Sequence, residues 1–381
     1  MNRTGVLIVG AGPAGLMLAC ELARQKVAVR IIDRRPNFPN GSRATGLQPR
    51  NPEVLDDLGI AEKILQSGSN EIIFRHCRKN EMGGEAGPDN NNLCTDTKYH
   101  HFFFIPQWRV EELLREKLAS FGVTVELNTD LENIIQTSKY VVAYMRKNKS
   151  VETLHCSNLV GCDGGKSTVR KILNMGFQCE SHEDECMRTG DTEIDGLVPD
   201  AWHLWLHPQL GMSKALCSLP NTSKWQLQAA TIPNEKGIIT EPTLENFQQI
   251  FQEQSNMSHV QSKNISWQSL YRVNVHMRDK FGIDRIFITG DAAHVHSVTG
   301  GLGMNTGIRD AYNLGSKLAS VIKNHANKTL MDTYEEERLP VAAWTLNISS
   351  ERQKVVVSSA RPGQGGMESS ASKDTNQLTL N

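Results

Sequence analysis

The stretch from Val6 to Asp33 constrains the fold more than any other part of the sequence. Apolar residues at 6–9 predict a short buried strand, and residues 27–32 predict a second one. Between them, "GAGPAG" places Gly10, Gly12 and Gly15 in a GxGxxG motif, and apolar residues at helical spacing follow it. Strand, glycine turn, helix and strand in this order predict a parallel α/β sheet of the nucleotide-binding kind.

Each glycine of this motif has its own physical task. Gly10 permits a tight turn, Gly12 lets backbone approach a pyrophosphate, and Gly15 lets the helix pack closely on the strand. Asp33 ends the second strand, where a carboxylate can accept hydrogen bonds from the ribose hydroxyls of an adenosine. We therefore predict a dinucleotide site, with a βα turn that binds no ligand as the alternative. The motif alone does not separate FAD from NAD.

The bulk composition excludes several classes of partner. The chain has 381 residues, enough for two packed domains, and its formal net charge of -1 argues against nucleic acid or an anionic membrane. Eight cysteines without a CxxC pair favour reduced thiols and a cytoplasmic protein. Residues 5–20 are apolar like a signal peptide, but glycines at motif spacing favour the nucleotide-binding interpretation. No other stretch is long and apolar enough to span a bilayer.

Two more glycine-rich turns follow strand-like runs. Asp163 lies in "NLVGCDGGKSTVRKIL", and Asp291 lies in "RIFITGDAAHVHSVTGGLGMNTG", which leads into a helix predicted to begin near Asn305. Glycines there let main chain approach a flat ring, and a helix N-terminus favours negative charge beside it. His294 and His296 lack the neighbouring acids or cysteines of a metal site, so we predict no metal.

The three motifs, in this order, resemble the fingerprints of the single-component FAD-dependent aromatic hydroxylases, in the phenol and polyketide hydroxylase branch. Segments such as "SRATGLQPRNPEVLDDLGI" and "FFIPQWRVEELLREKL" extend the resemblance from about residue 5 to 350. It implies that Asp163 serves the pyrophosphate region, that Asp291 binds the ribityl chain, and that Arg43 and Gln107 touch FAD. Arg109 is a further candidate, with a surface helix residue as the alternative. The predicted cofactor-binding residues are Gly10, Gly12, Ala14, Gly15, Asp33, Arg34, Arg43, Gln107, Arg109, Asp163, Asp291, Gly303, Met304 and Asn305.

The resemblance also implies the chemistry. FAD, bound tightly but not covalently, would be reduced by NADPH or NADH as a transient co-substrate, and O2 would then form a C4a-hydroperoxide that attacks a small aromatic substrate. No catalytic residue is identified; Tyr271 and Arg272, a phenol beside a cation, are weak candidates that could equally be structural strand residues. The oligomeric state stays open between a monomer and a homodimer. Candidate pocket liners, with core packing as the favoured alternative, are Trp202, Trp205, His207 and Trp225.

The expected fold class is α/β, with the fold of the 4-hydroxybenzoate hydroxylase type. It combines a Rossmann-like FAD-binding domain (the GR2 type, a parallel sheet with helices) with an inserted mixed β-sheet substrate domain. We expect the FAD-binding domain in residues 1–175, with a substrate-side segment at about 70–105, and again in 281–358. The substrate domain would span 176–280, and the polar residues 359–381 predict a disordered tail.

The third motif departs from the family pattern. Ser297 and Val298 stand where prolines are usual, and Leu302 and Arg309 stand where glutamines are usual. Two alternatives follow. One is a degenerate or truncated FAD-binding protein without oxygenase activity. The other is a flavin-dependent halogenase, although "WHLWLHP" does not match the Trp-x-Trp-x-Ile-Pro signature of that class.

Overall fold

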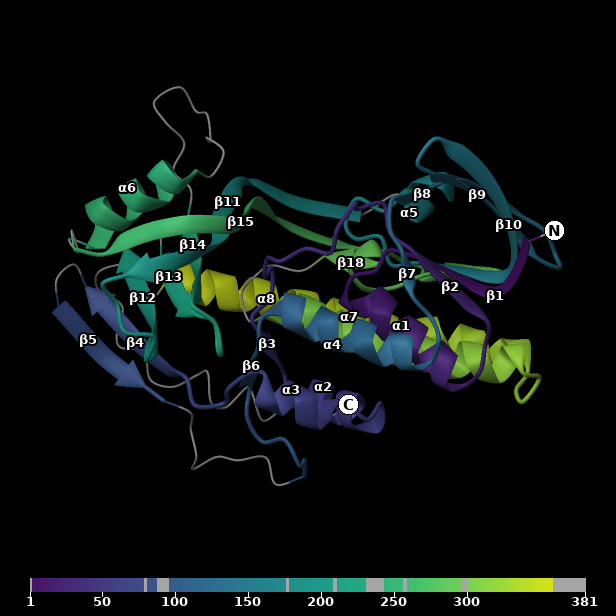
Figure 1. Ribbon diagram of the computed structural model, residues 1–381, viewed down its shortest axis with the longest axis horizontal. Coiled ribbons are helices and arrows are strands. Elements are labelled where there is room, and N and C mark those ends of the chain that lie inside the picture. The colour runs from purple at the N-terminus through teal and green to yellow at the C-terminus, as the bar shows by residue number, and fades with distance from the viewer. Residues whose placement is uncertain are drawn as a thin grey trace.

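The computed structural model describes residues 2–78, 81–87, 96–175, 178–207, 211–230, 243–255, 259–295 and 301–358. The tail at 359–381 lies outside these residues, as do His296, Ser297 and Val298. Two large sheets lie at opposite ends of the molecule, with a group of helices running between and beneath them (Figure 1). Each sheet corresponds to one of the two units that the sequence predicts.

The first sheet is built on parallel strands. Its spatial order is β16 (Gly282–Ile283), β17 (Ile286–Ile288), β10 (Ser150–Gly161), β1 (Asn2–Val9), β2 (Val29–Ile32) and β7 (Val125–Glu126). All pairs from β17 to β7 are parallel, whereas β16, β9 (Val141–Lys147) and β8 (Thr129–Gln136) add antiparallel pairs. Residues 6–8 are fully buried, as expected for a central strand covered on both faces.

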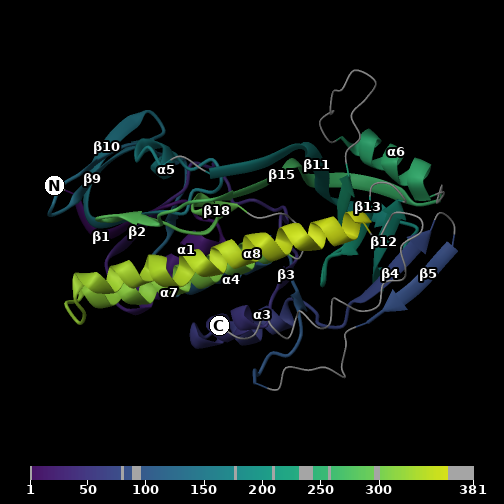
Figure 2. The same cartoon turned by 180° about the vertical axis from the view of Figure 1, so that it is seen from behind.

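Four helices pack together below this sheet, as the two opposite views show (Figures 1 and 2). They are α1 (Pro13–Arg24), α4 (Gln107–Ser120), α7 (Leu302–Ile322) and α8 (Asp332–Ser358). The remaining helices are α2 (Arg50–Asp57), α3 (Ala61–Gln66), α5 (Thr168–Ile172), α6 (Leu244–Ser255) and the 3-10 turns η1 (Gly290–Ala292) and η2 (Lys328–Met331). The helix predicted to begin near Asn305 begins earlier, at Leu302, because Gly301 takes a left-handed conformation and supplies its N-cap.

The second sheet is mixed. Its spatial order is β18 (His294–Val295), β15 (Gln261–Met277), β11 (Gln178–Asp195), β14 (Lys224–Ala230), β13 (Gly211–Ser218), β12 (Ala201–His207), β4 (Ile73–Arg78) and β5 (Glu81–Ala86). Only β12 and β4 pair in parallel. A short pair, β3 (Gly46–Leu47) and β6 (Phe103–Phe104), lies between the two units.

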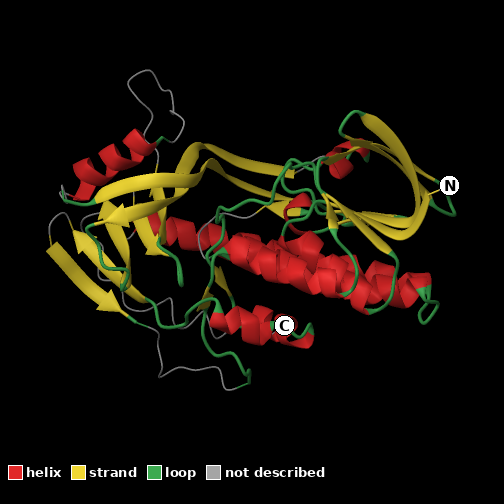
Figure 3. Ribbon diagram, in the orientation of Figure 1, coloured by secondary structure: helices red, strands yellow, loops and turns green. Residues whose placement is uncertain are grey.

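These two sheets confirm the predicted fold class, a Rossmann-like unit with an inserted mixed sheet. The long strands β11 and β15 run from one unit to the other and join them (Figures 1 and 3). The expected domain boundaries stay a prediction. In the part of the chain that the structure describes, no helix has both the length and the apolar character to cross a membrane.

Candidate cofactor site and active site

The turn between β1 and α1 has the steric surroundings that its glycines suggest. Gly10 has a φ of 104°, and a Cβ on Gly15 would lie 2.0 Å from the carbonyl oxygen of Gly10. A Cβ on Gly12, by contrast, would meet nothing within 4 Å. Gly12 is also the N-cap of α1, and no side chain caps the first N–H groups of the helix there. Gly10 and Gly15 therefore close the turn, and Gly12 opens it to an anion.

The carboxylate of Asp33 is held beside this turn. Its Oδ2 accepts a hydrogen bond from the Ala11 N–H at 2.8 Å and one from Arg35 Nη2 at 2.7 Å. Its Oδ1 accepts from the Arg35 N–H and Nε. Burial alone would raise the pKa of Asp33, but these hydrogen bonds hold it below the usual value. All four acceptor positions are used, so a ribose would have to replace part of the Arg35 contact.

Arg35 was not among the residues predicted from sequence. The run "DRRP" offers two adjacent arginines, and only the structure shows which one turns back to Asp33. The predicted residue, Arg34, is exposed.

The loop at 41–45 carries Arg43 and is fixed by the start of α4. The Gln107 N–H donates to the Ala44 carbonyl at 3.0 Å, and the Ala44 N–H donates to Gln107 Oε1 at 3.2 Å. The other end of the Gln107 amide donates to Glu111, whose pKa is raised by burial. The Gln107 side chain therefore positions the loop, whereas the Arg43 side chain is exposed.

Arg109 is engaged elsewhere. Its Nη1 lies 2.5 Å from Glu112 Oε2, and its Nε donates to Ser67 Oγ at 3.2 Å. These contacts with α4 itself and with the end of α3 favour the alternative of a surface helix residue, and a contact of Arg109 with FAD stays a prediction.

The second motif caps a helix. Asp163 Oδ2 accepts hydrogen bonds from the N–H groups of Thr168 and Val169 at the start of α5. Its Oδ1 is buried and accepts no hydrogen bond of good geometry. Arg170, on the same helix, donates to the carbonyls of Gly165 and Ala292 and so ties the second motif to the third. One carboxylate oxygen thus stays available to a ligand, and the other builds the turn.

The third motif meets the first one through bare backbone. Gly290 has a φ of 59°, and a Cβ there would lie 3.1 Å from the Ala14 Cβ and 3.7 Å from the Gly307 Cα. Asp291 follows it with an exposed side chain. Surrounding protein nevertheless raises the pKa of Asp291, and the charges of His294 and Arg43 counteract this. The exposed Asp291 side chain therefore lies within reach of the charge of Arg43, and we use the name cofactor recess for the place where Asp291, the β1–α1 turn and α7 meet, which is the expected FAD site.

The start of α7 is anchored by one amide. Asn305 is fully buried; its Oδ1 accepts from the Gln48 N–H at 2.7 Å and from Asn51 Nδ2 at 2.6 Å. Its Nδ2 donates to the carbonyls of Gly46 and Gly301. The side chain predicted to bind a cofactor is therefore used within the protein. Gly303 and Met304, partly exposed in the first turn, can offer only backbone N–H groups and apolar surface.

Comparison with known proteins identifies the family. A family model described as "FAD binding domain" matches residues 3–349. A flavin-dependent monooxygenase of Mycobacteroides abscessus is 41% identical over 91% of this chain and 73% of its own length. The 6-methylpretetramide 4-monooxygenase of Streptomyces rimosus is 35% identical over 90% of this chain and 60% of its own length. The crystal structure of the flavin-dependent monooxygenase PieE with FAD and substrate has a TM-score of 0.84 at 22% identity, over 99% of this chain and 70% of that one.

The chain belongs to the FAD-binding family of flavin-dependent monooxygenases. The residues present fit the cofactor of this family. The open face at Gly12 leaves room for a pyrophosphate, and Asp163 Oδ1 is a buried acceptor without a partner. Gly290, directly before Asp291, lies against Ala14 of α1 and Gly307 of α7, so the third motif adjoins both helices. Which residues touch FAD stays a proposal.

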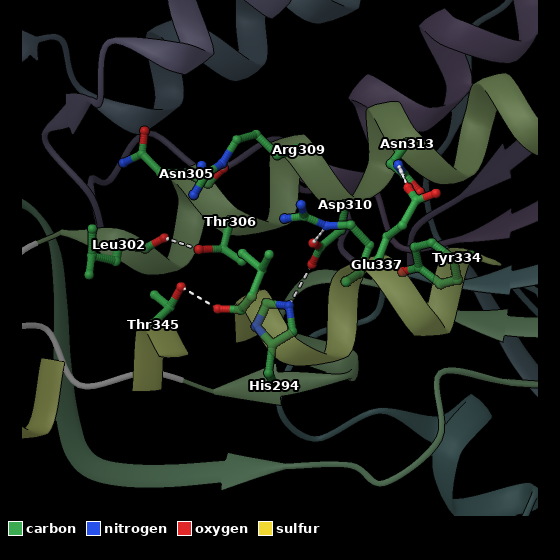
Figure 4. A network of polar contacts seen from close by, with 12 residues as sticks. His294, Leu302, Asn305, Thr306, Arg309, Asp310, Asn313, Tyr334, Glu337 and Thr345 are labelled. Carbon is green, nitrogen blue, oxygen red and sulfur yellow. Dashed lines mark hydrogen bonds and ion pairs between the residues drawn. The ribbon is translucent and has the colours of Figure 1, made fainter. Parts of the chain in front are cut away.

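A buried charge network holds the third motif of this monooxygenase in place (Figure 4). His294 Nε2 on β18 lies 2.5 Å from Asp310 Oδ2 on α7, and Arg338 Nε on α8 donates to Asp310 Oδ1 at 2.7 Å. Although burial alone would raise it, the charges of His294 and Arg338 lower the pKa of Asp310 to about 2. Arg309 points the other way, toward Asn305 (Figure 4). His294 is therefore a structural partner of Asp310, and no group of described residues could hold a metal ion.

The three tryptophans predicted as pocket liners divide between the two faces of the second sheet. Trp205 and Trp225 are buried in a cluster with Phe247 of α6, which is core packing. Trp202 instead meets Phe104, with ring centroids 4.8 Å apart. The side chains of the remaining candidates, His207, Tyr271 and Arg272, lie outside the described residues.

A continuous aromatic wall links Trp202 to the start of α7. Phe104 also contacts Phe102 at 4.7 Å, and Phe74 contacts Trp202 at 5.5 Å. Phe102 in turn lies against Gly301, where a Cβ would be 4.0 Å from its ring. The wall therefore reaches from the substrate sheet to the helix N-terminus of the cofactor recess.

Two glycine variants should separate packing from cofactor binding. Gly15→Ala places a methyl group 2.0 Å from the Gly10 carbonyl, so unfolding should become easier by about 1–3 kcal/mol. Gly12→Ala should cost no more than about 1 kcal/mol of stability as a poorer helix cap. It should nevertheless weaken FAD binding at least about tenfold, because its methyl group meets the ligand. Thermal melting and FAD titration of both apoproteins measure the two effects. Equal FAD affinity in Gly12→Ala and the unaltered chain would contradict this assignment.

Asp310→Asn should destabilise the protein by roughly 3–5 kcal/mol, because it leaves the buried guanidinium of Arg338 without a counter-charge. Asp279→Asn, in which the exposed carboxylate of an ion pair with Arg278 is neutralised, is the matched control and should cost less than about 1 kcal/mol. Urea unfolding at neutral pH compares them. If both variants lose the same amount of unfolding free energy, the Asp310 network does not stabilise the fold.

The same network predicts an acid transition. The pKa of Asp310 falls from 3.8 to about 2 on folding, so its stabilisation is complete above pH 3.8 and is lost as the pH falls toward 2. Asp310→Asn should flatten this part of the curve of unfolding free energy against pH. An unchanged slope in the variant would assign the transition to other carboxylates.

Proposed function

We propose that this monooxygenase hydroxylates a small aromatic substrate, phenolic or polyketide-like, with FAD as cofactor, NADPH or NADH as reductant and O2 as oxidant. When bound, FAD would take electrons from the nicotinamide and activate O2 for transfer of one oxygen atom to the ring. The relatives' names include a 6-methylpretetramide and a pentachlorophenol monooxygenase, which supports an aromatic substrate. The five cysteines whose side chains the structure describes are free, in keeping with reaction in the cytoplasm.

One observation carries the proposal. The aromatic wall from Phe74 and Trp202 to Phe102 ends at Gly301, beside the recess where the three glycine motifs meet. Aromatic rings in edge-to-face contact offer apolar surface that can pack on a planar substrate. They also exclude water from the site, and this exclusion is required for the oxygen transfer.

The residues of the chain would position and shield rather than attack. The N–H groups at the start of α7 present partial positive charge to a ligand in the recess. Asp291 and Arg43 would hold polar groups of the cofactor, and the wall would orient the ring of the substrate. Tyr271 and Arg272 stay the candidates for handling a phenolic proton.

The test is oxygen incorporation by the FAD-loaded protein. NADPH and NADH oxidation in air is followed with phenols, naphthols and hydroxyanthraquinones, and products formed under labelled O2 are weighed by mass spectrometry. We expect one aromatic class to stimulate oxidation and to gain one labelled oxygen. Bound FAD without an oxygenated product from any of these classes would favour the degenerate flavoprotein. Chloride-dependent halogenation would favour the halogenase.

The aromatic wall makes a second prediction. Trp202→Ala should raise the KM for the aromatic substrate about three- to tenfold and divert more reductant to hydrogen peroxide, because it removes about 0.5–1.5 kcal/mol of ring contact. Trp225→Phe, on the opposite face of the same sheet, is the control; it should lower the melting temperature and leave KM unchanged. An unchanged KM and peroxide yield in Trp202→Ala would exclude the wall from the substrate pocket.

A further inference from the structure

The loop at 41–45 is held from the substrate sheet as well as from α4. The Ser42 N–H donates to Asp191 Oδ2 on β11 at 2.9 Å, and the Ser42 carbonyl accepts a hydrogen bond from Gln226 Nε2 on β14. Asp191 and Gln226 face each other directly in the β11–β14 pair. The backbone N–H and the backbone carbonyl of Ser42 are thus each bound by a side chain of the neighbouring sheet.

A third contact from this sheet closes the same turn. Trp267, opposite Asp191 in the β11–β15 pair, packs directly on the backbone of Gly41. A Cβ on Gly41 would lie 1.9 Å from the Trp267 ring. Gly41, Ser42, Asp191 and Gln226 are all buried, so these contacts are shielded from water.

The hydrogen bonds on both sides of Arg43 determine its position. Gln107 holds the loop on the far side of Arg43, through Ala44, and Asp191 holds it on the near side, through Ser42. Between these two fixed peptides the Arg43 side chain is exposed, and its charge acts on Asp291 across the recess. A shift of Ser42 would therefore move a charge that faces the cofactor site.

We propose that Asp191 is a positioning residue for the cofactor: from the substrate sheet, it fixes the loop that presents Arg43 to FAD. The inference rests on the FAD-binding part of the proposed function and not on the hydroxylation itself. The hydrogen bond between Asp191 and Ser42 also joins the substrate sheet to the cofactor loop.

The buried charge of Asp191 lowers the free energy of unfolding. Burial raises the pKa of its carboxyl from the usual 3.8 to about 6, despite hydrogen bonds from Ser42 and Gln226, so keeping it charged at neutral pH opposes folding. Its Oδ1 is buried and accepts no hydrogen bond of good geometry. A residue kept only for stability would be better replaced by a neutral one, whereas a charged acceptor binds a peptide N–H more strongly.

The experiment is a titration of the full-length apoprotein with FAD, followed by fluorescence quenching, together with thermal melting at pH 7.5. Asp191→Ala should bind FAD about tenfold more weakly, because it releases a charge-assisted hydrogen bond. Asp191→Asn keeps an oxygen acceptor for the Ser42 N–H and should bind FAD within about threefold of the unaltered chain. Its melting temperature should equal or exceed that of the unaltered chain, since a buried charge is removed.

Two further variants keep the test decisive. Glu193→Ala, on the same strand, is the matched control; its carboxylate accepts a hydrogen bond from Asn264 of β15, and the variant should leave FAD affinity unchanged. Gln226→Leu releases the Ser42 carbonyl instead and should weaken FAD binding even where Asp191→Ala fails to fold. The inference is overturned if Asp191→Ala and Gln226→Leu both fold and bind FAD as tightly as the unaltered chain. It is also overturned if Asp191→Asn binds FAD as weakly as Asp191→Ala. If the chain binds FAD but forms no oxygenated product, the proposed hydroxylation is contradicted and the role of Asp191 is not.

Discussion

Close approach of bare backbone is the constraint on which the rest of the structure depends. Gly15 lies so near the Gly10 carbonyl that no side chain fits between α1 and the turn after β1. Gly290 lies between Ala14 of α1 and Gly307 of α7 in the same way. These contacts bring the first and third motifs, almost three hundred positions apart in the sequence, to one recess. Glycine is required there for steric reasons, before any ligand is considered.

The loops around this recess have little regular structure, so buried polar groups hold them. Asn305 binds Gly46 and Gln48, Asp310 joins three elements through His294 and Arg338, and Asp191 binds Ser42. Each of these side chains comes from a helix or strand and reaches a segment distant in sequence. Rigid elements thereby define the geometry of a site whose walls are mostly loop. The cost is visible at Asp191, where burial raises the pKa of the carboxyl.

Local sequence patterns predicted the architecture well, because the signals for the fold are short and repeated. The glycine spacing after β1, the apolar runs and the three motifs in order were enough for the α/β class and the flavin family. The individual roles of polar residues were less accessible. Gln107 and Asn305 were predicted to bind cofactor, and their amides are used to hold neighbouring backbone. Arg35, which pairs with Asp33, was not anticipated, since adjacent arginines look alike in a sequence.

The sequence by itself determined where backbone must turn sharply and which segments are buried, because glycine stereochemistry and apolar periodicity act over a few residues. Only the tertiary structure decided which side chains face the recess. Trp202 and Trp205 lie three residues apart on one strand. Trp205 is buried beneath α6, whereas Trp202 contacts Phe104 in the aromatic wall. Asp191 carries no motif at all, and its contact with Ser42 spans 149 positions. Such pairs form when two units dock, and no local pattern encodes them.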